Sequence, residues 1–450
     1  MAARARASSR VLPQTTHRSR EGGVRGASRS PRKGGVHSRS ASTADRRLVL
    51  SAPRVEIIIV NWNSLHETIE CVTAVNAQLA DVESALVTVV DNGSTDGSAL
   101  AIASKFPSVK LFALNENRGF TGGISAALRG SAAELVIYLN NDAIPEPGWL
   151  QALVNAIDSA PPDVISAGGK IVDLSGQLID FIGGVLTFDG HAFQPGFRFP
   201  LSSREEPAAG DEILFACGGN MISRRAPLAE LGGFDDDYFA YLEDVDFGWR
   251  SWIAGYRVIF EPRAVVRHAS GATSERLGHF ERGVLFERNA LQTAMKNYEE
   301  NALRESAGAI LFTYLHRLHH YATMRNSDTG ELRRSPFAGS GREDARKTFI
   351  GRVRRRLTGP PALASIDDPL TTMQFRAFEW IVRNGEKIAA KREAIQARRR
   401  RSDEEIFRRF PLHYVPTYPG DEGLMASALF RMLRPRLPSI ERSLSDIIRS

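Results

Sequence analysis

The sequence predicts an α/β fold built on a doubly wound, mainly parallel sheet. Two observations in its first third support this. Short runs of Val, Ile and Leu alternate with stretches whose apolar residues recur at helical spacing. Each apolar run also ends at polar or glycine-rich residues that favour a turn. Strands that alternate with helices at this interval are typical of parallel sheets with right-handed crossovers.

The elements follow in order along the chain. We expect strands at residues 55–60, 85–90, 109–113 and 135–138. Helices are expected at residues 65–79, 98–106, 124–129 and 149–160. The pattern then loosens to about residue 207, into short strands and glycine turns such as Gly168-Gly169. A strand at residues 257–260 precedes helices at 281–298, 303–321 and 370–401.

Composition divides the 450 residues into three parts. Residues 1–50 are rich in Arg, Ser and Gly and predict a disordered basic tail. Such a tail also resembles an organelle transit peptide. Residues 51–300 are expected to form the catalytic domain, and residues 301–450 a helical, Arg-rich C-terminal extension with a mobile linker near 323–364.

Charge and cysteine content exclude several classes of protein. Residues 1–50 hold twelve Lys or Arg residues against Glu21 and Asp45, so the net charge of +6 becomes −4 for the rest. A slightly acidic body argues against nucleic-acid binding. Cys71 and Cys217 cannot form a disulfide framework, which favours a reducing compartment. No apolar run approaches the ~18 residues of a membrane span.

The predicted strands end at Val60, Asp91, Asn115 and Asp142. Because these ends should open on the same edge of the sheet, we expect a ligand site there. Asp142 ends the sequence Leu-Asn-Asn-Asp of residues 139–142. A carboxylate is costly at the end of a buried strand unless it has a partner, and a divalent metal that carries phosphates would be one.

Five motifs, in this order, resemble the family 2 glycosyltransferases with the GT-A fold, particularly their rhamnosyltransferase-like branch. They are Ile-Val-Asn-Trp-Asn at 59–63, Val-Asp-Asn-Gly-Ser-Thr-Asp-Gly-Ser at 90–98, Asn-Arg-Gly-Phe at 117–120, Leu-Asn-Asn-Asp at 139–142 and Glu-Asp-Val-Asp at 243–246. The resemblance covers roughly residues 55–300. It implies an inverting enzyme that moves a sugar from a nucleotide-diphosphate sugar, such as dTDP-rhamnose, to a hydroxyl group.

The resemblance also implies roles for individual residues. Asp244 matches the catalytic base, and Asp142 with His268 the ligands of a divalent Mg or Mn ion. The nucleotide-sugar would be bound by Asn61, Asn63, Asp91, Asn117, Arg118, Gly119 and Asn141. The family's acidic metal motif is reduced here to Asn140-Asn141-Asp142, which predicts low metal affinity without the donor.

Four of these residues could instead have a purely structural role. Asp91 could cap its own turn, Asp142 could cap the helix near Trp149, and His268 could be a core histidine. Asp244 could instead favour the dipole at the start of a helix. Asp246 fits that structural role, since Arg250 lies four residues on and can pair with it.

The expected acceptor is a lipid-linked or cell-envelope glycan in polysaccharide biosynthesis. We expect a cytoplasmic protein that can contact the inner face of the plasma membrane peripherally, and no nucleic-acid partner. Two other classes stay open. One is a catalytically idle glycan- or membrane-binding module on the same fold. The other is a nucleotide-dependent oxidoreductase, which the absence of G-x-G-x-x-G after the first strand disfavours.

Overall fold

The computed structural model describes residues 52–269, 277–323, 369–418, 420–443 and 446. The predicted basic tail and almost all of the predicted linker near 323–364 lie outside these residues. Residues 51–450 form one compact unit. The division of this unit near residue 300 stays a prediction.

Within the described residues, nine strands form one mixed sheet, whose main path runs β3-β2-β1-β4-β10-β6-β11-β5. Its first four neighbours are parallel: β1 (Val55–Asn61), β2 (Ala85–Asn92), β3 (Lys110–Leu114) and β4 (Leu135–Asn140). The remaining strands are β5 (Ala143–Pro145), β6 (Val164–Asp173), β7 (Ile179–Phe181), β10 (Asn220–Arg224) and β11 (Arg257–His268). Of these, β10 is antiparallel to β4 and β6, and β11 is parallel to β6.

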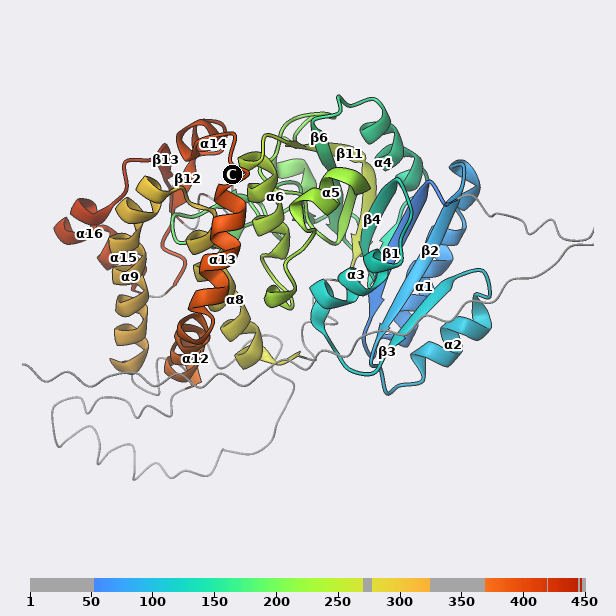
Figure 1. Ribbon diagram of the computed structural model, residues 1–450, viewed down its shortest axis with the longest axis horizontal. Coiled ribbons are helices and arrows are strands. Elements are labelled where there is room, and N and C mark those ends of the chain that lie inside the picture. Colours follow the sequence, from blue (N-terminus) through green and yellow to red (C-terminus); the bar gives the residue numbers. More distant parts are fainter. Residues whose placement is uncertain (1–51, 270–276, 324–368, 419, 444–445, 447–450) are drawn as a thin grey trace, which may run out of the picture. The chain divides into compact units, whose positions relative to one another are not determined.

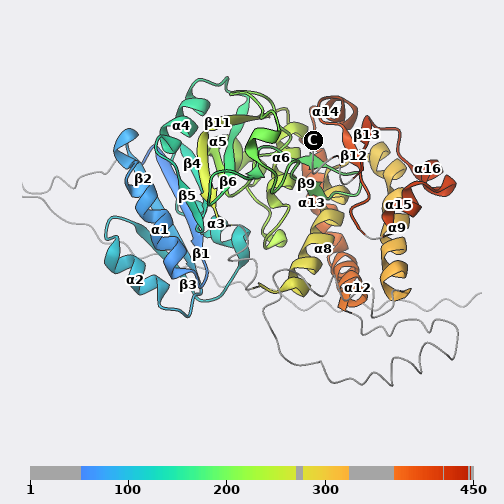
Figure 2. The same cartoon turned by 180° about the vertical axis from the view of Figure 1, so that it is seen from behind.

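Helices cover both faces of the parallel strands, because side chains along β1 alternate between two cores. Ile57 and Ile59 pack in one core with α1 (Leu65–Asn76), while Ile58 packs in the other with α3 (Gly119–Arg129). Figure 1 shows α3 beside β1, and Figure 2 shows α1 and α2 (Ser98–Lys105) from behind. The predicted doubly wound, mainly parallel α/β class of the GT-A type is confirmed.

The sequence pattern fails at β6, where Gly168-Gly169 was expected to form a turn. Both glycines instead lie inside a buried strand. A Cβ on Gly168 would lie 2.6 Å from the Cβ of Ala216, and one on Gly169 would lie 2.3 Å from Nδ2 of Asn220. The glycines therefore allow close packing against a distant segment, which periodicity cannot reveal.

A group of helices follows the sheet. The predicted helices 281–298 and 303–321 correspond to α8 (His279–Asn297) and α9 (Glu300–Thr323). The single helix predicted at 370–401 is wrong, because two helices, α12 (Pro369–Arg383) and α13 (Gly385–Gln396), meet at Asn384. Asn384 leaves helical geometry, and its side chain donates to the carbonyl of Trp380 at 2.8 Å. Figure 1 shows α12 and α13 against α8.

The smaller elements complete the chain. They are α4 (Trp149–Asp158), β8 (Val185–Leu186), β9 (Ala192–Phe193), α5 (Arg225–Leu231), α6 (Glu243–Ile253), α14 (Asp403–Arg409), β12 (Leu412–Tyr414), α15 (Asp421–Met425), α16 (Ala428–Leu433) and β13 (Ser439–Glu441). Among the helices that the structure describes, none is both long and apolar enough to cross a membrane.

Candidate active site

A cavity of about 670 Å³ opens where β1, β2 and β4 end. Polar side chains line one part of it and aromatic side chains another. Six of the predicted site residues line it: Asn117, Gly119, Asn141, Asp142, Asp244 and His268. The other four, Asn61, Asn63, Asp91 and Arg118, are not among the residues that line it.

Asp91 lies at the end of β2, and its carboxylate is held from two sides. Asn61 Nδ2 donates to Oδ1 at 2.8 Å, and the backbone N–H of Ser94 donates to Oδ2 at 3.2 Å. Asn61 is fully buried and also accepts from Thr68 at 2.8 Å. Asp91 therefore caps its own turn, the structural alternative, while Asn61 fixes the position of its carboxylate.

Asn92, which the sequence analysis did not single out, organises the loop that follows β3. Its Nδ2 donates to the carbonyl of Gly119 at 2.9 Å and to Oδ1 of Asn117 at 3.0 Å, while its Oδ1 accepts from the N–H of Arg118 at 2.9 Å. Asn63 holds the loop that follows β2 in a similar way, since its Oδ1 accepts from the N–H of Thr95 at 2.7 Å. Asparagine side chains therefore hold both loops at this edge of the sheet.

Gly119 begins α3 rather than lying in a loop before it, which corrects the predicted helix start at residue 124. Its φ is +71°, and a Cβ there would lie 2.2 Å from the carbonyl oxygen of Phe239. Only glycine satisfies both conditions. Asn141 is buried beside this loop, with its Nδ2 donating to Thr68 at 3.0 Å.

Asp142 and His268 are in contact at the edge of the sheet where the parallel strands end. His268 Nε2 lies 3.0 Å from Oδ1 of Asp142 and 3.2 Å from Nδ2 of Asn140. Its Nδ1 lies 2.9 Å from Oδ2 of Asp180 in β7. Burial disfavours the charged imidazole, but Asp142 and Asp180 outweigh burial and raise the pKa of His268 to about 10. The capping alternative for Asp142 is excluded, because Gly148 is the N-cap of α4.

The chemistry of this pair fits a divalent metal ion. Asp142 offers a carboxylate oxygen and His268 an imidazole nitrogen, and Asp180 orients the ring as carboxylates commonly do for metal-binding histidines. In the parts of the chain that the structure describes, no cluster of three or more His, Cys, Asp or Glu could hold a metal. A bound ion would therefore take its other ligands from substrate oxygens and water.

Asp244 lies at the start of α6, in the wall of the same cavity. Its Oδ2 accepts from the N–H of Gly218 at 3.1 Å, and its Oδ1 from the N–H of Val245 at 2.8 Å. Burial raises the pKa of Asp244, and these hydrogen bonds oppose that rise. Asp246 faces away and pairs with Arg250 at 2.7 Å, as the spacing predicted.

Glu243, which the sequence analysis left unassigned, is a second carboxyl group in this wall. It is 7% exposed, and its Oε2 has no hydrogen-bond partner within the described chain. Burial, and then the charge of Asp244, raise the pKa of Glu243 to about 8. Glu243 is therefore protonated near neutral pH. Asp180 was not predicted either, because it lies in the region before residue 207 where the sequence shows no clear strand or helix pattern.

Part of the chain is similar to known glycosyltransferases. Residues 56–232 match the model of glycosyl transferase family 2. The N-acetylglucosaminyl-diphospho-decaprenol L-rhamnosyltransferase of Mycobacterium tuberculosis is 29% identical over 201 residues, which cover 40% of this chain and 66% of the relative. The O-antigen biosynthesis protein RfbC of Myxococcus xanthus is 27% identical over 197 residues, which cover 42% of this chain and 15% of that protein.

Among solved structures, similarity extends to GalNAc-T7 with UDP, GalNAc and Mn²⁺, at 16% identity and a TM-score of 0.45, covering 64% of this chain and 54% of that one. It also extends to TarS 1-349 of S. aureus in complex with UDP-GlcNAc, at 18% identity and a TM-score of 0.41, covering 63% of this chain and 76% of that one. The match to the family model spans β1 to α5. Residues 56–232 are therefore similar to the family 2 glycosyltransferases.

Proposed function

We propose that this protein is an inverting, metal-dependent glycosyltransferase. It would move a sugar from a nucleotide-diphosphate sugar, with dTDP-rhamnose as the leading candidate, to a hydroxyl of a lipid-linked or cell-envelope glycan. The main supporting observation is that a half-buried carboxylate, Asp244, shares one cavity with the Asp142–His268 pair. An inverting transfer needs a base on the acceptor side and a cation beside the leaving diphosphate, and the Asp142–His268 pair would hold that cation.

The donor half of the cavity suits a nucleotide. Asp91, fixed by Asn61, would accept hydrogen bonds from the base or ribose. The loop held by Asn92 brings Asn117, Arg118 and Gly119 to the same edge of the sheet. Asn63 and Asn141 complete this proposed donor site.

Asp142 and His268 would hold a Mg²⁺ or Mn²⁺ ion. When bound, the ion would neutralise charge that develops on the departing diphosphate. Asp180 would keep the His268 ring in the orientation that binding needs. Because the described residues offer only these two ligands, we propose that the ion and the donor bind together.

Asp244 would accept the proton of the attacking acceptor hydroxyl. The N–H groups of Gly218 and Val245 keep its carboxylate in one orientation, so that its basic oxygen does not have to reorganise during the reaction. The aromatic part of the cavity, which includes Phe193, Tyr241 and Phe286, would receive the acceptor. Peripheral contact with the inner face of the plasma membrane would bring a lipid-linked acceptor to it.

A transfer assay tests this proposal. Purified protein with Mn²⁺, dTDP-rhamnose and polyprenyl-diphosphate-linked N-acetylglucosamine should release dTDP and form a disaccharide lipid, detected by mass spectrometry. Nuclear magnetic resonance of the product should show an anomeric configuration opposite to that of the donor. A panel of other nucleotide sugars identifies the donor if rhamnose is wrong. A product that keeps the donor's configuration would contradict the inverting mechanism.

A further inference from the structure

The turn at residues 235–242, which we call the Asp turn, connects the sheet to the C-terminal helices. It leads directly into Glu243 and Asp244, and its last four residues, 239–242, line the cavity. Its backbone is unusual, because the non-glycine residues Phe239, Tyr241 and Leu242 have positive φ values of 65°, 72° and 63°. Such conformations persist only where surrounding contacts impose them. The contacts that hold the Asp turn therefore determine where the cavity wall lies.

On one side, the Asp turn contacts α3. The N–H of Thr121 donates to the carbonyl of Phe239 at 3.2 Å. Ser125 donates to Asp236 at 2.5 Å. These contacts link the turn to the loop that forms the proposed donor site.

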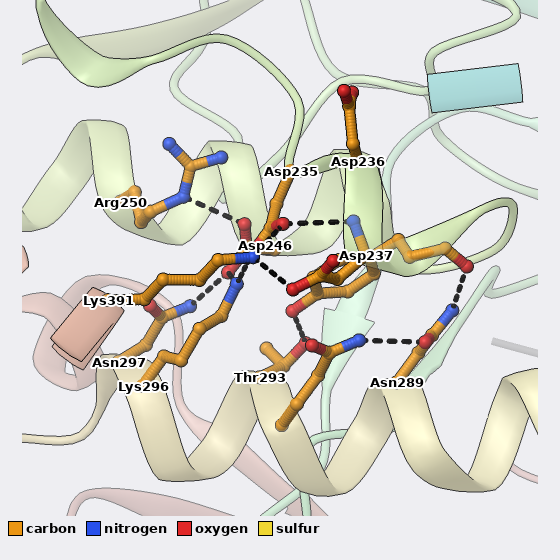
Figure 3. A network of polar contacts seen from close by, with 12 residues as sticks. Asp235, Asp236, Asp237, Asp246, Arg250, Asn289, Thr293, Lys296, Asn297 and Lys391 are labelled. Atoms are coloured by element: carbon orange, nitrogen blue, oxygen red, sulfur yellow. Dashed lines mark hydrogen bonds and ion pairs between the residues drawn. The ribbon is translucent and has the colours of Figure 1, made fainter. Parts of the chain in front are cut away.

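On the other side, α8 binds the backbone of the Asp turn. Nδ2 of Asn289, a fully buried residue, donates to the carbonyls of Tyr238, Ala240 and Tyr241 at 3.0, 2.9 and 2.8 Å. Lys296, which is 1% exposed, pairs with Asp235 at 2.6 Å. Figure 3 shows Asn289, Thr293 and Lys296 along α8, beside the acidic residues of the turn.

A third set of contacts comes from α13, more than 140 residues further along the chain. Lys391 bridges Asp235 and Asp237, with 2.5 Å between its Nζ and Oδ2 of Asp237, and Lys387 also pairs with Asp237. The side chain of Lys391 is 28% exposed, and those of Asp235 and Asp237 are 11% and 15% exposed. Solvent therefore screens this bridge less than it screens a surface ion pair. In Figure 3, the Lys391 side chain reaches the two carboxylates from the left, whereas α8 lies below them.

We propose that Lys391 is a positioning residue for sugar transfer, because its bridge between Asp235 and Asp237 holds the Asp turn in the form that sets the cavity wall and the start of α6. The C-terminal helices are then part of the transferase site and not only an appendage to it. This inference rests on the proposed function in taking Asp244 as the base.

Lys391→Met tests the bridge, because it removes the ammonium group and keeps most of the packing volume. We expect kcat to fall tenfold or more, while the donor KM stays within twofold, since α13 supplies none of the residues that line the cavity. Backbone hydrogen exchange over residues 235–245 should become at least tenfold faster, with β1 to β4 unchanged. Lys391→Arg should restore most of kcat and of the slow exchange.

Lys105→Met serves as a matched control, because Lys105 is an exposed lysine in the last turn of α2. It should change neither kcat nor exchange in the Asp turn. If Lys391→Met does not fold, Lys391→Gln takes its place in both measurements. Unchanged kcat, unchanged exchange in the Asp turn, or equal losses in kcat and donor affinity would overturn the proposal. A wild-type protein that transfers no sugar would contradict the proposed function, whereas hydrogen exchange would still test the bridge.

Discussion

His268 and Asp142 lie 126 positions apart in the sequence, yet His268 Nε2 lies 3.0 Å from Asp142 Oδ1. The contact forms because β11 pairs with β5, which places His268 opposite Ala143. Asp180 binds the other ring nitrogen at 2.9 Å, so two carboxylates hold one imidazole. This three-residue arrangement is the basis for the first prediction.

Asp180→Asn should weaken binding of the activating metal ion without changing the residues that would bind it. Loss of the carboxylate that orients the ring commonly lowers metal affinity by roughly 10- to 100-fold. We expect the Mn²⁺ concentration for half-maximal transfer to rise by that factor, with kcat at saturating Mn²⁺ nearly unchanged. Asp158→Asn is the control, because Asp158 is partly exposed and pairs with Arg54. An unchanged Mn²⁺ requirement in Asp180→Asn would argue against a metal at His268.

Asp244→Asn should separate binding from chemistry. Asparagine keeps the size of the side chain but cannot accept the acceptor's proton, and a positioned base contributes roughly 10²–10⁴-fold to a rate. We expect kcat to fall by that factor while the donor dissociation constant stays within threefold, as measured by calorimetry. Full activity of this variant would show that Asp244 is not the base.

Glu243 should give the transfer reaction an alkaline limit. Burial and the nearby charge of Asp244 raise its pKa to about 8, so the carboxyl is protonated at neutral pH and ionises above that value. Asp246 on the same helix and Cys217 on the neighbouring loop are the other titratable groups that interact with it. Ionisation would place a second negative charge beside Asp244, so kcat/KM should decline as the pH rises through about 8. The neutral variant Glu243→Gln should lose this decline.

The same pKa has a consequence for stability. The pKa of Glu243 in the folded protein lies above its ordinary value of 4.5. The stabilisation from its protonated form is therefore complete below about pH 4.5 and is lost as the pH rises through about 8. Melting temperatures of wild type and Glu243→Gln, compared between pH 5 and 9, should diverge as the pH rises. Parallel curves would contradict the shifted pKa.

Lys296→Met should destabilise the fold. Lys296 is buried and pairs with Asp235 at 2.6 Å and Asp246 at 3.1 Å. Removing one partner from a buried ion pair costs about 3–5 kcal/mol, because the remaining charge stays buried. We expect a loss of about 3 kcal/mol in the free energy of unfolding, measured in urea. A loss no larger than that of Lys105→Met, expected below about 0.5 kcal/mol, would show that the remaining cations compensate.

Local patterns predicted the first four strands because each is a short apolar run with a polar end. They also placed Asp91, Asn141 and Asp142 at one edge of the sheet. Properties that depend on distant contacts could not be predicted in this way. Gly168 and Gly169 lie inside β6 because Ala216 and Asn220 approach them, and Asp180 reaches His268 through the pairing of β7 with β6.

The high pKa of Glu243 is a similar case, because it arises from burial that only the folded chain creates. The bridge made by Lys391 was also hidden from sequence reasoning, since its partners lie more than 150 residues away. In α13 alone, Lys391 is one of several charged residues, and spacing gives no reason to select it.

The central claim is that a nucleotide sugar and a divalent metal bind together in the cavity lined by Asp142, Asp244 and His268. The most direct test measures the melting temperature against a panel of nucleotide sugars, each with and without Mn²⁺. We predict that one donor raises the melting temperature by several degrees only when Mn²⁺ is present, and that Asp142→Ala abolishes this shift. If no nucleotide sugar or nucleoside diphosphate changes the melting temperature in either condition, the claim is contradicted.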